Sequence, residues 1–393
     1  MNTTLEGGKP REWNIRELAK FIVEELKPRG EFLTPFNVIS LAIIAVGAVL
    51  VIIRFAFGIG SITNLSQSTP WGIWIGFDVV TGVAFAGGAY VVTFLVYILG
   101  AKKYHSIVRV TVLNGFLAYM FYAGALMLDL GRPWKIINPI IGNSFGVSSV
   151  LFLVAWHFML YMAAEFIEFS PAVAEWLGWR KLRKVVGGLT IGAVIFGITL
   201  STLHQSGLGA LFLMAKSKIH PLWFTEFIPV LFFISSIFAG LSMVIFEGSI
   251  SHKVFSSRIN HEGHASHDNI LLGLAKICAG VMFVYFFLKV LVLVHSQQLH
   301  LLPTGWGLWF LVEVLGFVLL PGYLFFRAVR NDDVRMVKYA SVITLVGIVL
   351  NRLNISVIAY DWYAANPYIP SWMEIEVTAA VICVEIWAFR WVI

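Results

Sequence analysis

The chain has few cysteines for its length. Among 393 residues there are two, Cys278 and Cys383, and no CxxC or CxxCH sequence occurs. So few thiols cannot supply four cysteine ligands to an iron–sulfur cluster, and without CxxCH no c-type haem can be attached. Both cysteines lie in apolar runs, which predicts that they contribute to packing and form no disulfide.

Charge is also scarce, at 13% of the residues, whereas 59% are hydrophobic. Apolar runs of 20 or more residues recur from Phe36 to the C-terminus, and about 20 such residues suffice to cross a bilayer. The composition therefore predicts an all-α polytopic membrane protein and excludes a soluble globular domain. Residues 1–31 are polar and charged, so we expect no cleavable signal peptide, and the first apolar run should insert as an anchor.

Ten spans are expected, after a cytoplasmic N-terminal segment of residues 1–33. Residues 12–27 of that segment predict an amphipathic helix, either a membrane-surface lead-in or a docking site for an inner partner. The transmembrane domain occupies residues 34–393. Its expected spans are 34–57, 71–99, 110–130, 148–168, 185–206, 222–248, 268–295, 305–327, 338–360 and 373–392.

Lysine and arginine are rare in every second loop. Of the 28 such residues, 20 lie in the N-terminal segment, alternate loops and the C-terminus, four lie in the other loops, and four lie inside spans. By the positive-inside rule, both termini are cytoplasmic. The net charge of +6 is thus a topology signal and does not indicate binding of nucleic acid.

Ionisable residues recur in the outer halves of the spans. Each costs about 2.5–3.5 kcal/mol near a helix centre on insertion scales, so their preference for one side predicts a shared polar pocket. At about 1.5 Å of rise per residue, His204 should lie roughly 5 Å from the outer boundary. The alternative is pairwise neutralisation, such as Asp129 with Arg132. The expected pocket residues, with two sequence neighbours included, are Asp129, His204, Asp78, Arg132, Gln205, Arg352, Glu226 and Glu313.

A second polar set lies deeper, and its members are candidates for a proton route. They are Tyr119, Glu247, Glu385 and His157. Glu165 and Glu168 lie nearer the inner face, where solvation of a helix end is the simpler interpretation.

The outer pocket has the chemistry that a quinone head group needs, because the ring oxygens require donors and reduction requires protons. A b-type haem would need two histidines at one level, and His157 should lie roughly 13 Å deep against 5 Å for His204. Electrons are therefore expected from a partner at the outer face. A His-x-x-His-x-x-His sequence from His261 to His267 lies in an inner loop, and we expect no metal there. The competing hypotheses are an ion-coupled secondary transporter and a b-type cytochrome anchor.

The region from Trp71 to Asp78 and the region from Trp306 to Glu313 share a WGxW pattern and a seven-residue gap to an acid. The similarity is typical either of an internal repeat or of two interfacial tryptophan belts.

Several motifs together identify a family. They are Pro70-Trp71-Gly72-Ile73-Trp74 with Asp78, Asp129-Leu130-Gly131-Arg132 with Trp134, Ser148-Ser149-Val150-Leu151-Phe152, Leu177-Gly178-Trp179, His204-Gln205-Ser206, His220-Pro221-Leu222-Trp223, Val244-Ile245-Phe246-Glu247-Gly248-Ser249, Arg330-Asn331-Asp332 and Arg352-Leu353. In these motifs, over about residues 36–390, the sequence resembles the NrfD/PsrC family of membrane subunits, and within it the HybB-like branch that includes the membrane subunit of hydrogenase 2.

The resemblance implies two four-helix bundles, spans two to five and six to nine, with peripheral helices. It implies a menaquinone or ubiquinone site facing the periplasm, and no haem or iron–sulfur cluster in this chain. The implied partners are a periplasmic ferredoxin-like iron–sulfur subunit, through it a hydrogenase or multihaem cytochrome c, and further membrane or cytoplasmic subunits. The implied location is the bacterial inner membrane. Asp129, His204 and Asp78 look like surroundings of the quinone, and Tyr119 and Glu247 look like parts of the proton route.

The sequence departs from the branch at two points. Leu153 stands where HybB-like sequences can carry a glutamate, which weakens a proton path through that position. The N-terminal helix is also longer than expected for the hydrogenase subunit. The chain is thus also similar to the HmcC-like subunit of a transmembrane multihaem cytochrome complex.

Overall fold

The computed structural model describes residues 14–25, 27, 33–67, 69–142, 146–254 and 261–392. Apart from one isolated bridge between Ile219 and Tyr360, the regular structure in these ranges is helical. Nine helices of the described part are long and apolar enough to cross a membrane. The predicted all-α polytopic membrane fold is confirmed.

The second to fifth spans contact one another as a first bundle, whose opening helix is interrupted. A turn at Gly87 divides that helix, and π-helical stretches occupy both of its ends. The elements are η2 (Trp74–Val79), α3 (Val80–Ala86), α4 (Gly88–Thr93) and η3 (Phe94–Ile98), followed by α5 (His105–Asp129), α7 (Val150–Trp176) and α8 (Arg180–Leu211).

The sixth to ninth spans likewise contact one another and form a second bundle. The described helices therefore have the two four-helix groups that were expected. The elements are α9 (Ile228–Val254), α10 (His261–His295), a composite helix of α11 (Gly305–Leu311), η9 (Val312–Leu319) and α12 (Leu320–Arg330), and finally α13 (Val334–Leu353) with η10 (Asn354–Ile358).

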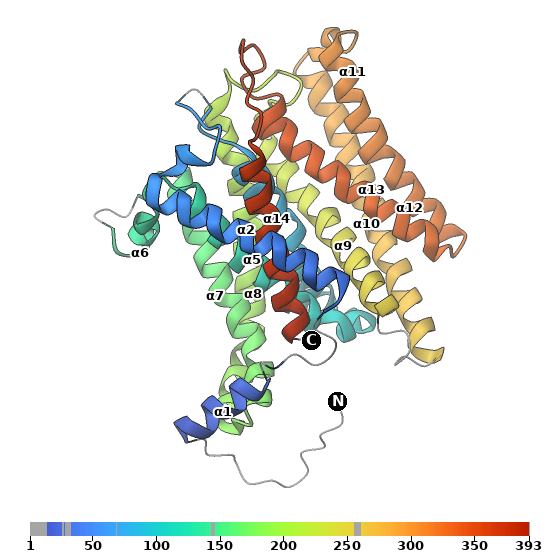
Figure 1. The fold of residues 1–393 in the computed structure, drawn as a ribbon. Coiled ribbons are helices and arrows are strands. Elements are labelled where there is room, and N and C mark those ends of the chain that lie inside the picture. The colour runs from blue at the N-terminus through green and yellow to red at the C-terminus, as the bar shows by residue number, and fades with distance from the viewer. Residues whose placement is uncertain are drawn as a thin grey trace.

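Two helices lie outside the bundles as an antiparallel pair, α2 (Pro35–Phe57) and α14 (Trp372–Val392), drawn blue and red in Figure 1. Trp387 Nε1 donates to Ser40 Oγ at 2.9 Å, which joins the end of α14 to the start of α2. Glu374, Glu376, Glu385 and Arg390 make α14 more charged than the nine apolar helices. The tenth span therefore stays a prediction.

The predicted N-terminal helix corresponds to α1 (Ile15–Glu25). It lies at one end of the molecule (Figure 1), where Phe21 contacts Trp176 with 5.1 Å between ring centroids. Residues 1–13 and 26 lie outside the described part.

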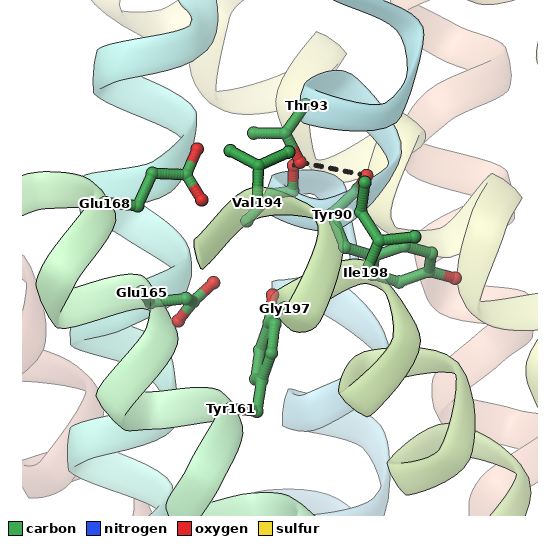
Figure 2. A pocket seen from close by; sticks show the side chains of 9 residues that line it. Tyr90, Thr93, Tyr161, Glu165, Glu168, Val194, Gly197 and Ile198 are labelled. Atoms are coloured by element: carbon green, nitrogen blue, oxygen red, sulfur yellow. Dashed lines mark hydrogen bonds between the residues drawn. The ribbon is translucent and has the colours of Figure 1, made fainter. Parts of the chain in front are cut away.

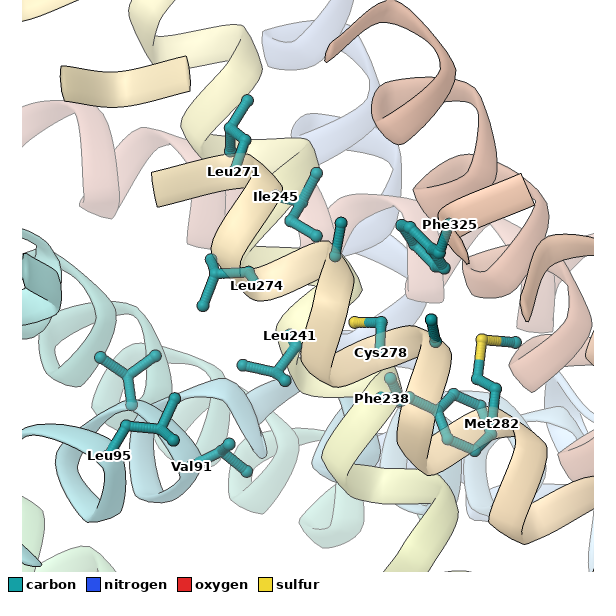
Figure 3. Packing of buried hydrophobic residues seen from close by; sticks show 14 of the residues in the cluster. Val91, Leu95, Phe238, Leu241, Ile245, Leu271, Leu274, Cys278, Met282 and Phe325 are labelled. Carbon is teal, nitrogen blue, oxygen red and sulfur yellow. The ribbon is translucent and has the colours of Figure 1, made fainter. Parts of the chain in front are cut away.

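The two bundles meet where small residues bring their backbones together. A methyl group added at Gly240 of α9 would lie 2.1 Å from the backbone nitrogen of Gly88, so neither position can accept a larger side chain without separating the helices. Beside this contact, apolar side chains of α4, α9, α10 and α12 interlock (Figure 3). Cys278 is fully buried in this cluster as a free thiol, as predicted.

Several helix ends differ from the predicted ones, and three of them change the surroundings of polar residues. Helix α8 continues past Ser206 to Leu211, because Ser206 Oγ donates to Thr202 O at 2.9 Å and the polar run stays helical. Helix α7 continues through Pro171 to Trp176. Helix α9 begins only at Ile228, since the preceding residues form turns. A polar run and a proline thus predicted helix ends at positions where the backbone stays helical.

Candidate functional site

Asp129 is the last residue of α5, and its Oδ1 atom is buried without a hydrogen-bond partner. The neighbouring charge is Arg54 of α2, which is only 3% exposed. Arg54 Nε donates to Leu128 O at 2.7 Å, and Nη2 donates to Leu130 O. Arg54 therefore caps the carbonyl end of α5 and interacts electrostatically with Asp129.

The expected pairing of Asp129 with Arg132 is not found. Arg132 is exposed, and no ion pair joins it to a described residue. The sequence placed the two residues three positions apart, but the chain leaves the helix after Asp129 and directs Arg132 outward. Arg54 was missed because it lies 75 positions earlier, and only its unusual place inside an apolar run could have marked it.

Asp78 lies close enough to Asp129 for the two carboxyl groups to interact electrostatically. It belongs to η2 and accepts a hydrogen bond from Thr378 Oγ1 of α14 at 3.0 Å. Trp74 Nε1 donates to the carbonyl of Glu374 at 3.1 Å. The peripheral helix α14 therefore forms one wall of the Asp129–Asp78 site.

The loop before α14 is held by the Glu374 side chain. Glu374 accepts hydrogen bonds from Tyr368 Oη at 2.5 Å, Ser371 N at 2.8 Å and Asn64 N at 3.0 Å. Burial and the hydrogen bond to Glu374 raise the pKa of Tyr368 above its ordinary value, so it stays a donor. These contacts fix the loop over the site.

His204 lies deeper than predicted. Its ring centroid is 5.8 Å from that of Tyr119, and Tyr119 precedes Asp129 by ten residues of α5, or about 15 Å. The cause is the continuation of α8 beyond Ser206. The His204 Nδ1 atom lies 3.1 Å from Val154 O, whereas its Nε2 atom is buried without a partner in the described structure. Gln205 has a different role, since its Nε2 donates to Val83 O at 2.8 Å and ties α8 to α3.

The two histidines of α7 and α8 do not fit a haem. The His204 ring is packed between Phe158, 5.6 Å away, and Tyr119. His204 Nδ1 faces a backbone carbonyl, and His157 is half-buried on the helix that carries Phe158. A porphyrin plane between two imidazoles would have to displace these rings.

Glu165 is the residue that sequence reasoning placed wrongly. Solvation of a helix end does not apply, because α7 continues for eleven residues beyond it and the side chain is 2% exposed. Neither carboxylate oxygen makes a hydrogen bond of good geometry, although the Tyr161 hydroxyl group lies near enough to interact with the carboxyl group. The hydroxyl groups of Tyr161 and Tyr119 are likewise buried without a well-formed hydrogen bond. The spacing of Tyr161, Glu165 and Glu168, four and three residues, would have placed them on one helix face.

These side chains surround a pocket with about 170 Å³ of empty space, including its open part. In Figure 2, Tyr161, Glu165 and Glu168 of α7 point towards residues of α4 and α8. Tyr119 continues the row, with its ring 4.6 Å from that of Tyr161 and next to His204. A polar row thus runs from Glu168 to His204 inside the first bundle.

A second row lies on another side of α5. Asn114 Nδ2 donates to Glu247 Oε2 at 2.5 Å, and Glu247 interacts electrostatically with Glu385 of α14. Tyr122, one turn from Tyr119, interacts electrostatically with both and with Asp78. The predicted proton-route residues therefore divide, with Glu247 and Glu385 in this row and Tyr119 in the other.

In the second bundle, Glu313 is surrounded by donors. Oε2 accepts from Trp223 Nε1 at 2.7 Å and from Asn354 Nδ2 at 2.5 Å. Oε1 accepts from Asn351 Nδ2 at 2.7 Å and lies 3.9 Å from Lys289 Nζ. Three of about four acceptor positions of this carboxylate are thus taken, and the remaining one is on Oε1, the oxygen nearest to Lys289.

Arg352 belongs to the same cluster. Its Nη1 donates to Asn351 Oδ1 at 2.9 Å and its Nη2 to Ser235 Oγ at 2.7 Å, and the guanidinium lies 3.6 Å from the Phe232 ring centroid. The residues expected in one pocket thus occupy separate bundles. Glu226 is exposed before α9 begins, not buried in a span as expected.

Both acids of the WGxW regions lie in π-helical stretches, Asp78 in η2 and Glu313 in η9. Such stretches are rare and frequently occur at functional sites. Near the histidine-rich segment, the rings of His252 and His267 stack at 4.1 Å, while the side chains of His261 and His264 lie outside the described part.

Comparison with protein families matches residues 61–361 to the family described as "Polysulphide reductase, NrfD". The chain belongs to the NrfD family. The resemblance inferred from the motifs is confirmed.

Relatives of this NrfD protein extend over most of its length. A protein of Nitratidesulfovibrio vulgaris is 45% identical over 92% of this chain and 93% of its own. The probable Ni/Fe-hydrogenase 2 b-type cytochrome subunit of Escherichia coli is 29% identical, covering 88% of each chain. The integral membrane subunit of the menaquinone reductase of N. vulgaris is 28% identical over 81% of this chain and 80% of its own.

Proposed function

We propose that this NrfD protein is the quinone-interacting membrane subunit of a multisubunit respiratory redox complex. Relatives named as membrane subunits of a menaquinone reductase and of a hydrogenase support the proposal. The observation that carries it is the Oδ1 atom of Asp129, which is buried without a hydrogen-bond partner at the end of α5. A buried carboxyl group without a partner is costly, and a quinone head group would offset that cost.

Reduction of a quinone takes up two electrons and two protons, and oxidation of the quinol releases them. The electrons come from, or go to, a partner at the outer face, a periplasmic iron–sulfur subunit or a multihaem cytochrome c. Asp129 exchanges one proton with a ring oxygen at Oδ1, and Arg54 holds Asp129 in place. The menaquinone or ubiquinone lies between Asp129 and the Asp78 wall. The membrane is the bacterial inner membrane, with the termini cytoplasmic and this site towards the periplasm.

Protons reach the site along one of the two polar rows. The row of Glu247, Glu385, Tyr122 and Asp78 leads towards Asp129, and the row of Glu168, Glu165 and Tyr161 leads towards His204. The first is the proposed supply for Asp129, because the Tyr122 ring of that row packs against Gly82, one turn from Asp78.

The test is quinone-linked turnover of the complex purified with its partner. Asp129→Asn should lower turnover by about 10²–10⁴-fold, the usual contribution of a positioned acid–base group, while the complex still assembles. Arg132→Gln, three positions away and exposed, is the matched control and should retain turnover. Wild-type turnover in both Asp129→Asn and His204→Ala would disprove the site.

The variants Glu247→Gln and Glu165→Gln distinguish between the two rows. Each variant complex is reconstituted in proteoliposomes, where quinone binding and proton uptake are measured together. Glu247→Gln should impair proton-coupled turnover and leave quinone binding intact. If only Glu165→Gln impairs it, protons use the other row.

A further inference from the structure

The second bundle holds a charge cluster that does not balance. Lys289, Arg352 and Glu313 are 5%, 1% and 1% exposed, respectively. Glu313 is the acid that interacts electrostatically with both cations, at 3.9 Å from Lys289 Nζ and through Asn351 to Arg352. The described side chains thus place two positive charges against one negative charge, and an uncompensated buried charge costs several kcal/mol.

Three neutral donors already bond to the oxygens of Glu313, and Lys289 Nζ stays 3.9 Å from Oε1. Arg352 is also fixed by Ser235 and by the Phe232 ring. Lys289 differs from Arg352 in this respect. Its Nζ makes no hydrogen bond to a described residue, and its other contacts are the rings of Tyr285 and Phe310, 5.8 and 5.6 Å away.

Lys289 lines a pocket between α9, α10 and α11 that has about 270 Å³ of empty space, including its open mouth. The other polar side chains of the lining are Thr225, Gln298 and Trp223, whose Nε1 is already bonded to Glu313. The rest of the wall is Leu222, Leu231, Val292, Leu293 and Phe310. An ammonium group and a hydroxyl group face the same space, and both can donate to an anion.

We propose that this pocket binds one small inorganic monoanion, such as chloride, at Lys289. One negative charge makes the cluster neutral, and a single-atom anion needs fewer donors than a polyatomic oxyanion, which suits a mostly apolar wall. The site is independent of the quinone site, since it lies in the other bundle and uses none of the residues assigned to electron or proton transfer.

The probe is bromide, whose anomalous scattering locates it in crystals of the wild-type protein grown or soaked with bromide in place of chloride. We expect one bromide peak in contact with Lys289 Nζ. No peak at this position, or density at Lys289 that continues into an acyl chain, would overturn the proposal. Because this measurement uses the wild type, it does not depend on whether a variant folds or turns over.

The second measurement is the thermal unfolding midpoint in chloride and in gluconate at equal ionic strength. Wild type should unfold at a higher temperature in chloride. Lys289→Met should lose both this difference and the bromide peak. Lys276→Met removes an exposed cation from the same helix and should retain both. Equal midpoints in chloride and gluconate for the wild type would contradict the proposal.

Discussion

Glu165 in the first bundle and Glu313 in the second are equally buried, at 2% and 1% exposure, yet they differ in their surroundings. Glu313 accepts three hydrogen bonds and has a lysine nearby, whereas neither oxygen of Glu165 has a hydrogen-bond partner. A fully bonded carboxylate contributes to structure, while an unbonded one in lipid costs stability and marks a place where a proton, water or ligand acts.

The same contrast extends to the neighbours. Asn351 and Asn354 donate to the Glu313 carboxylate, and Arg352 donates to Asn351. Around Glu165, the hydroxyl groups of Tyr161 and Tyr119 lack partners in the described structure. The buried polar groups around Glu313 are therefore bonded to one another, whereas those around Glu165 are not.

The largest expected effect separates the two glutamates. Glu313→Leu leaves Lys289 and Arg352 without their carboxylate, so it should lower the free energy of unfolding by about 3–5 kcal/mol. Glu165→Leu removes a group with no partner, so stability should stay unchanged or rise. Unfolding of the purified variants in lipid nanodiscs measures both. A large loss of stability in Glu165→Leu would show that the comparison is wrong.

The next effect concerns the two arginines near Asp129. Arg54→Met removes the donors to Leu128 O and Leu130 O, and each buried group left unbonded costs about 1–3 kcal/mol. Turnover should fall as well, since Asp129 loses its support. Arg132→Met is exposed and should change stability by less than about 0.5 kcal/mol. Equal effects of the two substitutions would remove Arg54 from the site.

The smallest expected effect is the pH dependence of folding stability that His220 contributes. His220 lies outside the spans, 4% exposed, with Trp306 and Trp362 centroids 5.2 and 4.8 Å from its own. Burial lowers its pKa below 6.5, so the unfolded chain binds the proton more readily. Neutral, buried His220 therefore makes its full contribution to stability above about pH 6.5. That contribution is lost as the pH falls towards the lower folded pKa, and it amounts to about 1.4 kcal/mol for each unit by which the two pKa values differ.

His220→Gln should flatten this dependence of the unfolding midpoint between pH 7.5 and 5. An unchanged slope would mean that another group titrates.

Much of the fold could be predicted, because membrane insertion depends on local composition. Asp78 and Asp129 were identified as charges in apolar runs, and both lie in one site. The error at Glu165 arose because Pro171 and Glu168 resemble the end of a span, while the structure continues the helix through them. The error at Arg132 arose from choosing the neighbour in sequence.

The sequence alone determined the membrane class, the apolar spans, the family and the polar residues that the spans carry. Hydropathy is a property of about 20 consecutive residues and needs no knowledge of other helices. Only the tertiary structure decided that Arg54 bonds to the carbonyl groups on either side of Asp129, that Glu313 is bonded and that Glu165 is not. Those pairings depend on the rotation and tilt of each helix, which are set by packing against its neighbours and cannot be read from an apolar run.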